Sequence, residues 1–224
     1  MPRDNSRQGK SINNLRRTTR HIESRGNYLI IVEGITEKKY FECLKDDLKI
    51  KSIDIRIFSA DGGDPLEIIE YTYNLYQDFL KKREKGAVKL NKVFCVFDDD
   101  KKPEKYKAAL NKAKKYDFTA ITSIPCFEFW FLLHYCYTTG CFVSYDDLRP
   151  KLETEMRKAG ILKKDEAYSK SDVELYTKLK PNQDNAINNA TKLAEKHPNE
   201  DGCTNPSTKV HLLVKELQNQ KDFK

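Results

Sequence analysis

Four acidic residues follow closely after short apolar runs of the chain. In the folded protein their carboxylates could meet at one place. Glu33 follows the run YLIIV, and Asp98 and Asp100 follow the run VFCVF. Glu37 comes four residues after Glu33, in the first turn of an expected helix. Carboxylate oxygens are the ligands that Mg²⁺ and Mn²⁺ prefer, and such ions assist phosphodiester cleavage by stabilising the attacking and leaving oxygens. The pattern predicts a metal site formed by these four carboxylates; the alternative is a pair of solvated acidic loops.

Two further side chains are candidates for the same site. Glu128 interrupts the apolar segment CFEFWFLL, where a buried carboxylate without a partner would be costly. It either lines the acidic site, caps a neighbouring helix or pairs with a Lys or Arg. Lys170 lies between Tyr168 and Tyr176, so it is a candidate for contacting phosphate beside stacking aromatic rings. A solvated surface lysine is the simpler interpretation of Lys170.

Alternating strands and helices are expected to position the carboxylates. The run from Tyr28 to Val32 is apolar at every position, as in a strand buried on both faces of a parallel sheet. The other three expected strands are Ile53 to Ile57, Val93 to Phe97 and Phe118 to Thr122. With helices between them, these runs predict an α/β fold with an open, mostly parallel four-stranded sheet flanked by helices. Sites on such sheets lie beyond the carboxyl ends of the strands, where Glu33 and Asp98 fall.

Capping residues and prolines mark the expected helices. Thr36 is the expected N-cap of the helix that carries Glu37, and Asp64 with Glu67 predicts a capping box for a helix ending near Arg83. After Pro125 the pattern is helical, beginning with a largely buried helix from Phe127 to Tyr137. Further helix starts are expected at Ser144 with Asp147, at Ser171 with Glu174, and at Pro181 and Pro206.

Positive charge is concentrated at the N-terminus. The 224 residues carry a net charge of +7, most of it within residues 1–26. Arg16, Arg17, Arg20 and Arg25 of this basic arm are candidates for binding nucleic-acid phosphates, or they only keep the terminus soluble. The expected organisation is a basic arm (1–26), an α/β core (27–124) and a helical C-terminal part packed on the core (125–224).

Other features of the composition narrow the class of protein. No apolar run is long enough to span a membrane and no apolar signal segment is present, so we expect a cytoplasmic protein without a membrane partner. The six cysteines are scattered and none forms a CxxC pair. This spacing argues against a disulfide framework or a zinc site.

Four separated motifs resemble the RloB family, also called AbiL-type abortive-infection proteins. The motifs are IVEGITEKKYF, VFDDD, IPCFEFWFLLHY and NPSTKVHLLVKEL, in this order along the chain. The first two also resemble the toprim fold of topoisomerases, primases and the overcoming-lysogenization-defect nucleases. The chain departs from the family pattern at Ile124, because the family usually has Asn before the proline of the third motif.

The resemblance implies a component of an anti-phage defence system that is usually encoded beside an AAA- or ABC-type ATPase. By position, the four carboxylates would be the metal ligands and catalytic residues of a toprim-like nuclease. We therefore expect a metal-dependent nuclease subunit that cleaves DNA or RNA and is gated by its ATPase partner. The alternative is a non-catalytic sensor or scaffold that binds nucleic acid or the ATPase. A topoisomerase is disfavoured, because the chain has no evident room for a domain carrying a nucleophilic tyrosine.

Overall fold

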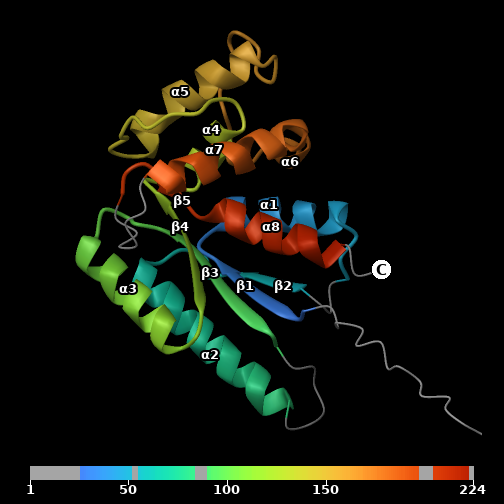
Figure 1. The fold of residues 1–224 in the computed structure, drawn as a ribbon, viewed down its shortest axis with the longest axis vertical. Helices are drawn as coiled ribbons and strands as arrows, with labels where there is room; N and C mark the ends of the chain where they lie inside the picture. Colours follow the sequence, from blue (N-terminus) through green and yellow to red (C-terminus); the bar gives the residue numbers. More distant parts are fainter. Residues whose placement is uncertain (1–25, 52–54, 84–89, 197–203, 222–224) are drawn as a thin grey trace, which may run out of the picture.

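One open sheet organises the molecule. The computed structural model describes residues 26–51, 55–83, 90–196 and 204–221, and within them five strands lie in the order β2-β1-β3-β4-β5 (Figure 1). The strands are β1 (Tyr28–Val32), β2 (Ile55–Ser59), β3 (Lys92–Asp98), β4 (Thr119–Ile124) and β5 (Ser207–Thr208). The first four are parallel and β5 pairs antiparallel with β4. The mostly parallel α/β fold is confirmed, with one short strand more than the sequence predicts.

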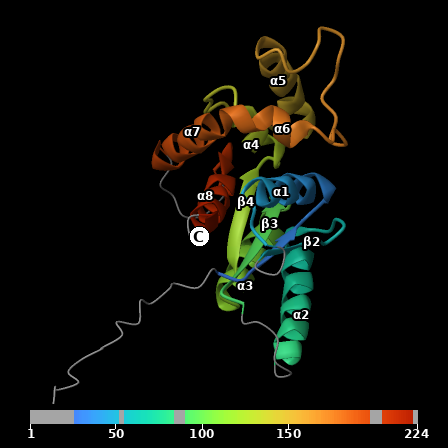
Figure 2. The same cartoon turned by 90° about the vertical axis from the view of Figure 1, so that its right-hand side faces the viewer.

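Helices cover both faces of the sheet (Figures 1 and 2). On one face, α2 (Pro65–Arg83) and α3 (Pro103–Lys115) pack against each other and against the strands. On the other face lie α1 (Ile35–Asp47) and α8 (Val210–Lys221). None of the described helices is both long and apolar enough to cross a membrane.

Strand β1 contributes to two hydrophobic cores. Leu29 and Ile31 pack in the core beneath α2 and α3, whereas Ile30 and Val32 pack in the core shared with α1 and α8. Every residue of β1 is buried, and full burial of an aliphatic side chain contributes about 1.5–3 kcal/mol. The continuous apolar run is therefore the sequence of a strand covered on both faces.

A group of shorter helices lies beyond the carboxyl ends of the parallel strands (Figure 1). They are α4 (Glu128–Leu133), α5 (Tyr145–Lys158), α6 (Leu175–Leu179), a 3₁₀ turn (Lys180–Asn182) and α7 (Gln183–Lys196). Helix α4 is entirely buried, as predicted, but it is shorter than the predicted span from Phe127 to Tyr137. After Leu133 the backbone tightens, because the N–H of Tyr135 donates to the carbonyl of Leu132, three residues back, at 3.0 Å.

Some of the predicted helix starts are wrong. Helix α1 begins at Ile35 with Gly34 as its N-cap, so Thr36 lies inside the first turn, where it is buried. The Ser171 box fails as well, because α6 starts only at Leu175. Pro206 precedes β5 rather than a helix. In each case the side-chain pattern was correct for a turn, but tertiary packing decided where the helix began.

Helix α5 starts where predicted, but the predicted capping box does not form. Ser144 is the N-cap residue, but its hydroxyl makes no capping hydrogen bond. Oδ2 of Asp147 accepts a hydrogen bond from the backbone N–H of Val143 at 2.9 Å, one residue before the N-cap, instead of from the N–H of Ser144. Pro181 lies in the 3₁₀ turn immediately before α7, close to the predicted start.

The capping box of α2 is confirmed. Oδ1 of Asp64 accepts hydrogen bonds from the backbone N–H groups of Leu66 (3.1 Å) and Glu67 (3.2 Å). Oε2 of Glu67 accepts a hydrogen bond from the N–H of Asp64 at 2.8 Å, which completes the reciprocal pair. Asp64 also pairs with Lys105 of α3, so the same side chain links the two helices on this face.

Replacing Asp64 by alanine is expected to destabilise the fold by about 1–2 kcal/mol, because first-turn N–H groups lose their acceptor. Urea unfolding followed by circular dichroism would measure the change. Asp78→Ala, also in α2, is the matched control, because Asp78 pairs only with the exposed Lys81 at 3.4 Å and should contribute little. Equal destabilisation by the two substitutions would contradict the capping role.

Helix α8 ties the end of the described chain to its beginning. Oε1 of Gln220 accepts a hydrogen bond from the N–H of Gly26 at 2.8 Å, and its Nε2 donates to the Tyr28 hydroxyl at 2.7 Å. The Tyr28 hydroxyl in turn donates to Glu216, which also pairs with Lys92. These contacts lie at the amino ends of β1 and β3, opposite to the edge that carries the acidic residues.

Candidate functional site

Glu33 and Asp98 lie side by side at the carboxyl edge of the sheet. Strands β1 and β3 are hydrogen-bonded neighbours, with Val32 paired with Val96. The backbone N–H of Glu33 continues this ladder to the carbonyl of Val96 at 3.1 Å. The N–H of Asp98 then donates to Oε2 of Glu33, also at 3.1 Å. The two carboxylates are thus positioned by the sheet itself, beyond the carboxyl ends of the strands as the sequence predicts.

Glu37 joins them from the first turn of α1. A β-carbon added at Gly34 would lie only 3.1 Å from Oε2 of Glu37, so the glycine leaves room for this carboxylate. Burial raises the pKa of Glu37, and the charge of Glu128 raises it further, so the two carboxylates are within electrostatic reach of each other. Glu37 therefore lies between the sheet edge and the helical part.

Asp100 stands at the rim of this group. It lies in the turn after β3, where Asp100 and Lys101 both adopt left-handed backbone conformations with φ of 54° and 55°. Such conformations are unfavourable for side chains other than glycine, although aspartate tolerates them better than most. The Asp100 carboxylate is partly exposed and lies 3.3 Å from Nζ of Lys102. Its charge nevertheless raises the pKa of Glu33, so it belongs to the same electrostatic group.

The third motif connects directly to the strand-end acids. The N–H of Phe127 donates to Oδ2 of Asp98 at 3.0 Å. The next residue, Glu128, is 2% exposed, and its Oε1 lies 2.8 Å from Nζ of Lys170. Of the alternatives open from the sequence, the ion pair is the one found, and it lies within the acidic group. Lys170 is accordingly a partner of a buried carboxylate rather than a solvated surface lysine.

A family model described as RloB-like protein matches residues 28–217. The chain belongs to the RloB family. No curated protein and no solved structure matches the chain. All the described acids named above lie within the matched span, as does Lys170. The departure of the chain from the RloB pattern at Ile124 has a structural basis, because this side chain is 2% exposed and packs in the core beneath α2 and α3.

Burial and mutual repulsion perturb the acids of this RloB site. Burial, with the charges of Glu37 and Asp100, raises the pKa of Glu33 to about 7, against the N–H of Asp98, which lowers it. Burial and the charges of Glu33, Glu37 and Glu128 raise the pKa of Asp98 well above its usual range. Lys170 counters this effect by lowering the pKa of Glu33 and of Glu37. The carboxylates of this group therefore carry more negative charge than the described cations beside them neutralise.

Two tyrosines, Tyr145 and Tyr168, also belong to the site. From the sequence, Tyr168 was considered only as a stacking aromatic ring near Lys170, and Tyr145 was not considered. The ring of Tyr145 lies 4.3 Å from Nζ of Lys170 and holds the ammonium by a cation–π contact. Tyr168 is 6% exposed, and its hydroxyl is buried without a hydrogen-bond partner among the described residues. Burial first, and then the charge of Glu128, raises the pKa of Tyr168, so the hydroxyl keeps its proton. A buried donor without a partner beside carboxylates suits a bound water or substrate oxygen.

The donor chemistry of this group fits a hard divalent cation, and its present side-chain arrangement fits only in part. Carboxylate oxygens and an excess of negative charge are what Mg²⁺ or Mn²⁺ requires. Among the described residues, however, no three Asp, Glu, His or Cys side chains are already spaced to hold one ion. One oxygen each of Glu33 and Asp98 accepts a backbone N–H, which leaves the second oxygen of each carboxylate for an ion.

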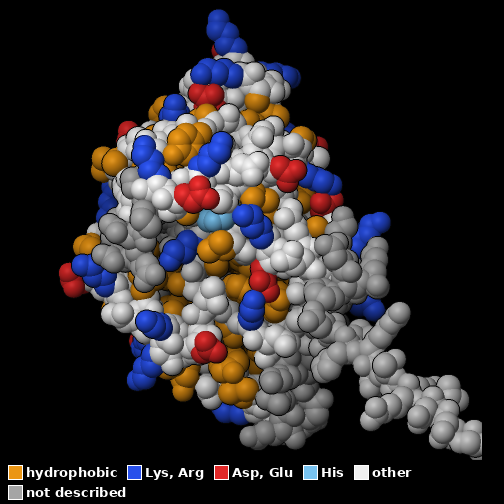
Figure 3. Space-filling view, viewed as in Figure 1, with side chains coloured by type: hydrophobic (Ala, Val, Ile, Leu, Met, Phe, Trp, Pro, Cys, Tyr) orange, Lys and Arg blue, Asp and Glu red, His pale blue; other side chains and the backbone are white. Residues whose placement is uncertain are grey.

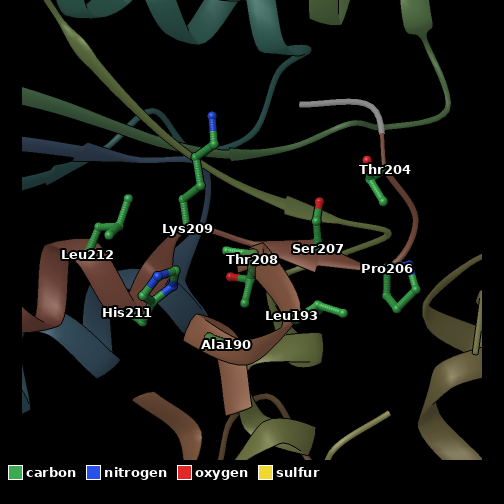
Figure 4. A pocket seen from close by; sticks show the side chains of 10 residues that line it. Ala190, Leu193, Thr204, Pro206, Ser207, Thr208, Lys209, His211 and Leu212 are labelled. Carbon is green, nitrogen blue, oxygen red and sulfur yellow. The ribbon is translucent and has the colours of Figure 1, made fainter. Parts of the chain in front are cut away.

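A separate apolar cavity of about 180 Å³ lies between α7, β5 and α8 (Figure 4). Leu193, Pro206 and Leu212 line it together with His211, whose pKa is lowered to about 4 by burial and the charge of Lys215. Figure 3, which faces α7 and α8, shows basic, acidic and apolar side chains interspersed over this side. Among the described residues, no acidic side chain lines the cavity and none of the strand-end acids reaches it, so it is distinct from the site at the sheet edge.

The C-terminal motif around this cavity serves the fold. Oγ1 of Thr208 accepts a hydrogen bond from the N–H of Val210 at 3.2 Å and so caps α8. Asn205 holds the neighbouring loop, because its Nδ2 donates to the carbonyl of Phe142 at 2.7 Å. His211 is buried on the first turn of α8. Thr208 and His211 therefore cap and pack the last described helix, and Asn205 fixes the loop beside it.

Proposed function

We propose that the chain is a metal-dependent nuclease subunit that hydrolyses phosphodiester bonds in DNA or RNA. The observation that carries this proposal is the convergence of Glu33, Glu37 and Asp98 at the carboxyl edge of a parallel sheet, next to a buried ion pair of Glu128 and Lys170. Open α/β sheets place their ligands at this edge. Membership of the RloB family and the resemblance of the first two motifs to toprim nucleases support the same chemistry.

The residues of the site would act either as metal ligands or as hydrogen-bond donors to the substrate. Glu33 and Asp98 would hold Mg²⁺ or Mn²⁺, with Glu37 and Asp100 turning toward the same ion. The ion would neutralise the charge of the phosphate and lower the pKa of a water nucleophile. With a pKa of about 7 in the absence of an ion, Glu33 is also able to accept a proton near neutral pH. Lys170 and the Tyr168 hydroxyl are donors for substrate oxygens.

The basic arm is proposed to capture nucleic acid away from the acids. Its candidate arginines, Arg16, Arg17, Arg20 and Arg25, lie outside the described residues. Gly26, the last residue of the arm, lies just before the amino end of β1, whereas Glu33 follows the carboxyl end of the same strand. A five-residue strand separates these points by about 16 Å. The arm therefore begins at the opposite edge of the sheet from the proposed chemistry.

We also propose that an AAA- or ABC-type ATPase gates this activity within an anti-phage system, as the family resemblance implies. An ungated nuclease would damage its own cell. The isolated chain is therefore expected to cleave slowly, and addition of the ATPase encoded beside it, with ATP, should accelerate cleavage.

A metal titration and a cleavage assay would test the proposal together. Calorimetry should detect binding of Mn²⁺ to the purified chain, and a labelled single strand, a duplex and total RNA should be incubated with the same preparation in Mn²⁺ and in EDTA. Cleavage that needs the ion supports the nuclease. Metal binding without cleavage, with or without the ATPase, would contradict it.

The second candidate is a non-catalytic sensor or scaffold that binds nucleic acid or the ATPase. The observation in its favour is that no three described acids are already spaced to ligate one ion. It predicts that Mn²⁺ does not bind with measurable affinity and that the ATPase binds equally well when the carboxylates are replaced by amides.

A further inference from the structure

Lys170 supplies positive charge at the centre of the acidic site. Its ammonium lies 2.8 Å from Oε1 of Glu128, and its charge lowers the pKa of Glu33 and Glu37. One lysine from the helical part is thus shared by carboxylates from α4, from β1 and from α1. It occupies the neighbourhood in which a divalent cation would be bound.

Glu128 requires a cation at this position. Its side chain is 2% exposed, and a buried carboxylate that loses its partner without replacement is strongly unfavourable. In the absence of a metal ion, the pair with Lys170 meets this requirement. A divalent ion near the same carboxylates would meet it too, with twice the charge.

The contacts of the Lys170 side chain allow its ammonium group to leave Glu128. Its side chain is 51% exposed and lies on the irregular segment between α5 and α6. Besides Glu128, its ammonium contacts the Tyr145 ring at 4.3 Å through a cation–π interaction. Rotation of a flexible four-carbon side chain would release the ammonium without unfolding any helix.

We propose that Lys170 is a resident counter-charge that leaves Glu128 when a divalent cation enters the acidic site and then contacts a phosphate of the nucleic acid. This inference rests on the proposed metal-dependent function. It makes occupancy of the site by metal a condition for phosphate binding by Lys170. The empty site thereby keeps its acids partly neutralised and its phosphate-binding group engaged.

Calorimetric titration of the full chain with Mn²⁺ tests the displacement. Lys170→Met is expected to bind Mn²⁺ roughly tenfold more tightly than wild type, because the ion no longer displaces a charge. Lys170→Arg should stay close to wild type. Lys39→Met is the control for general loss of charge, because Lys39 lines the same hollow between α1 and residues 170–176, and its effect should be much smaller.

Tyr145→Leu provides a second test that keeps the lysine. Loss of the ring should loosen Lys170 and tighten Mn²⁺ binding several-fold, so it decides the matter if Lys170→Met does not fold. For the phosphate contact, a labelled oligonucleotide should be titrated with Ca²⁺ present and absent. Lys170→Met should weaken oligonucleotide binding only when Ca²⁺ is present.

The outcomes separate the two proposals. If wild type binds no Mn²⁺, the proposed metal-dependent function fails and this inference fails with it. If wild type binds Mn²⁺ but Lys170→Met and Tyr145→Leu bind it no more tightly, only the displacement is wrong. Weaker Mn²⁺ binding by Lys170→Met would show that Lys170 positions Glu128 as a ligand, which also overturns the displacement.

Discussion

Asp98→Asn and Glu33→Gln should each reduce metal-dependent cleavage by about 10²-fold or more, because each removes a charge that the ion and the transition state need. The amides keep the shape of the side chains. In Asp98→Asn the new amide oxygen can still accept the N–H of Phe127, and in Glu33→Gln it can still accept the N–H of Asp98. Single-turnover cleavage of a labelled substrate in Mn²⁺ would measure the loss.

Asp99→Asn is the matched control for these variants. Asp99 is the middle residue of the same acidic run, but its carboxylate faces the backbone of Lys101 rather than Glu33. It should therefore cleave at close to the wild-type rate. An equal loss in Asp99→Asn, or full activity in Asp98→Asn, would show that the acidic run acts by its overall charge and not through an ion held at the strand ends.

Asp98→Asn and Glu33→Gln should also be more stable than wild type at pH 8 in the absence of metal. Burial and repulsion raise the folded-state pKa of Glu33 from 4.5 to about 7, and that of Asp98 moves in the same direction. A carboxyl whose pKa is raised by folding contributes stability that is complete below its unfolded pKa and is lost as the pH rises through its folded pKa. The unfolding temperature of the metal-free protein should therefore fall as the pH rises from about 4.5, the ordinary value for Glu33, to above its folded-state pKa of about 7.

Thermal unfolding of wild type, Glu33→Gln and Asp98→Asn across this pH range would measure the effect. Each amide should flatten the pH dependence and raise the unfolding temperature at pH 8 by several degrees, as expected when a functional site is built at the expense of stability. Mn²⁺ should raise the unfolding temperature of wild type alone. Variants that unfold at lower temperature than wild type at pH 8 would show that the ionised carboxylates stabilise the fold.

The strand-end half of the site was predictable because it depends on few interactions. Two apolar runs ending in acids form adjacent parallel strands, and parallel neighbours bring their carboxyl ends to one edge. This rule places Glu33 and Asp98 at the carboxyl edge, and the direct pairing of β1 with β3 then brings them side by side. Glu37 follows because helix α1 begins directly after β1, so its first turn stays at the same edge.

The helical half of the site could not be placed from the sequence. Lys170 and Tyr145 meet at 4.3 Å although they lie on separate segments, and nothing in their local pattern indicates the contact. Glu128 could be recognised as a buried charge in need of a partner, but the partner depends on how α5 and its following loop pack. Strand β5 was missed for a similar reason, because two residues carry no periodicity and pair only through tertiary contacts.

The contacts of α8 with the start of the chain affect when the protein can fold during its synthesis. Gly26 and Tyr28 emerge from the ribosome early, but Glu216 and Gln220, which bind them, are translated nearly two hundred residues later. The part of the sheet face that α8 covers, over β4, therefore stays open to water until α8 has been translated. Only a chain translated through α8 has its sheet covered on both faces, so translation interrupted before α8 would leave apolar fragments for chaperones and proteases.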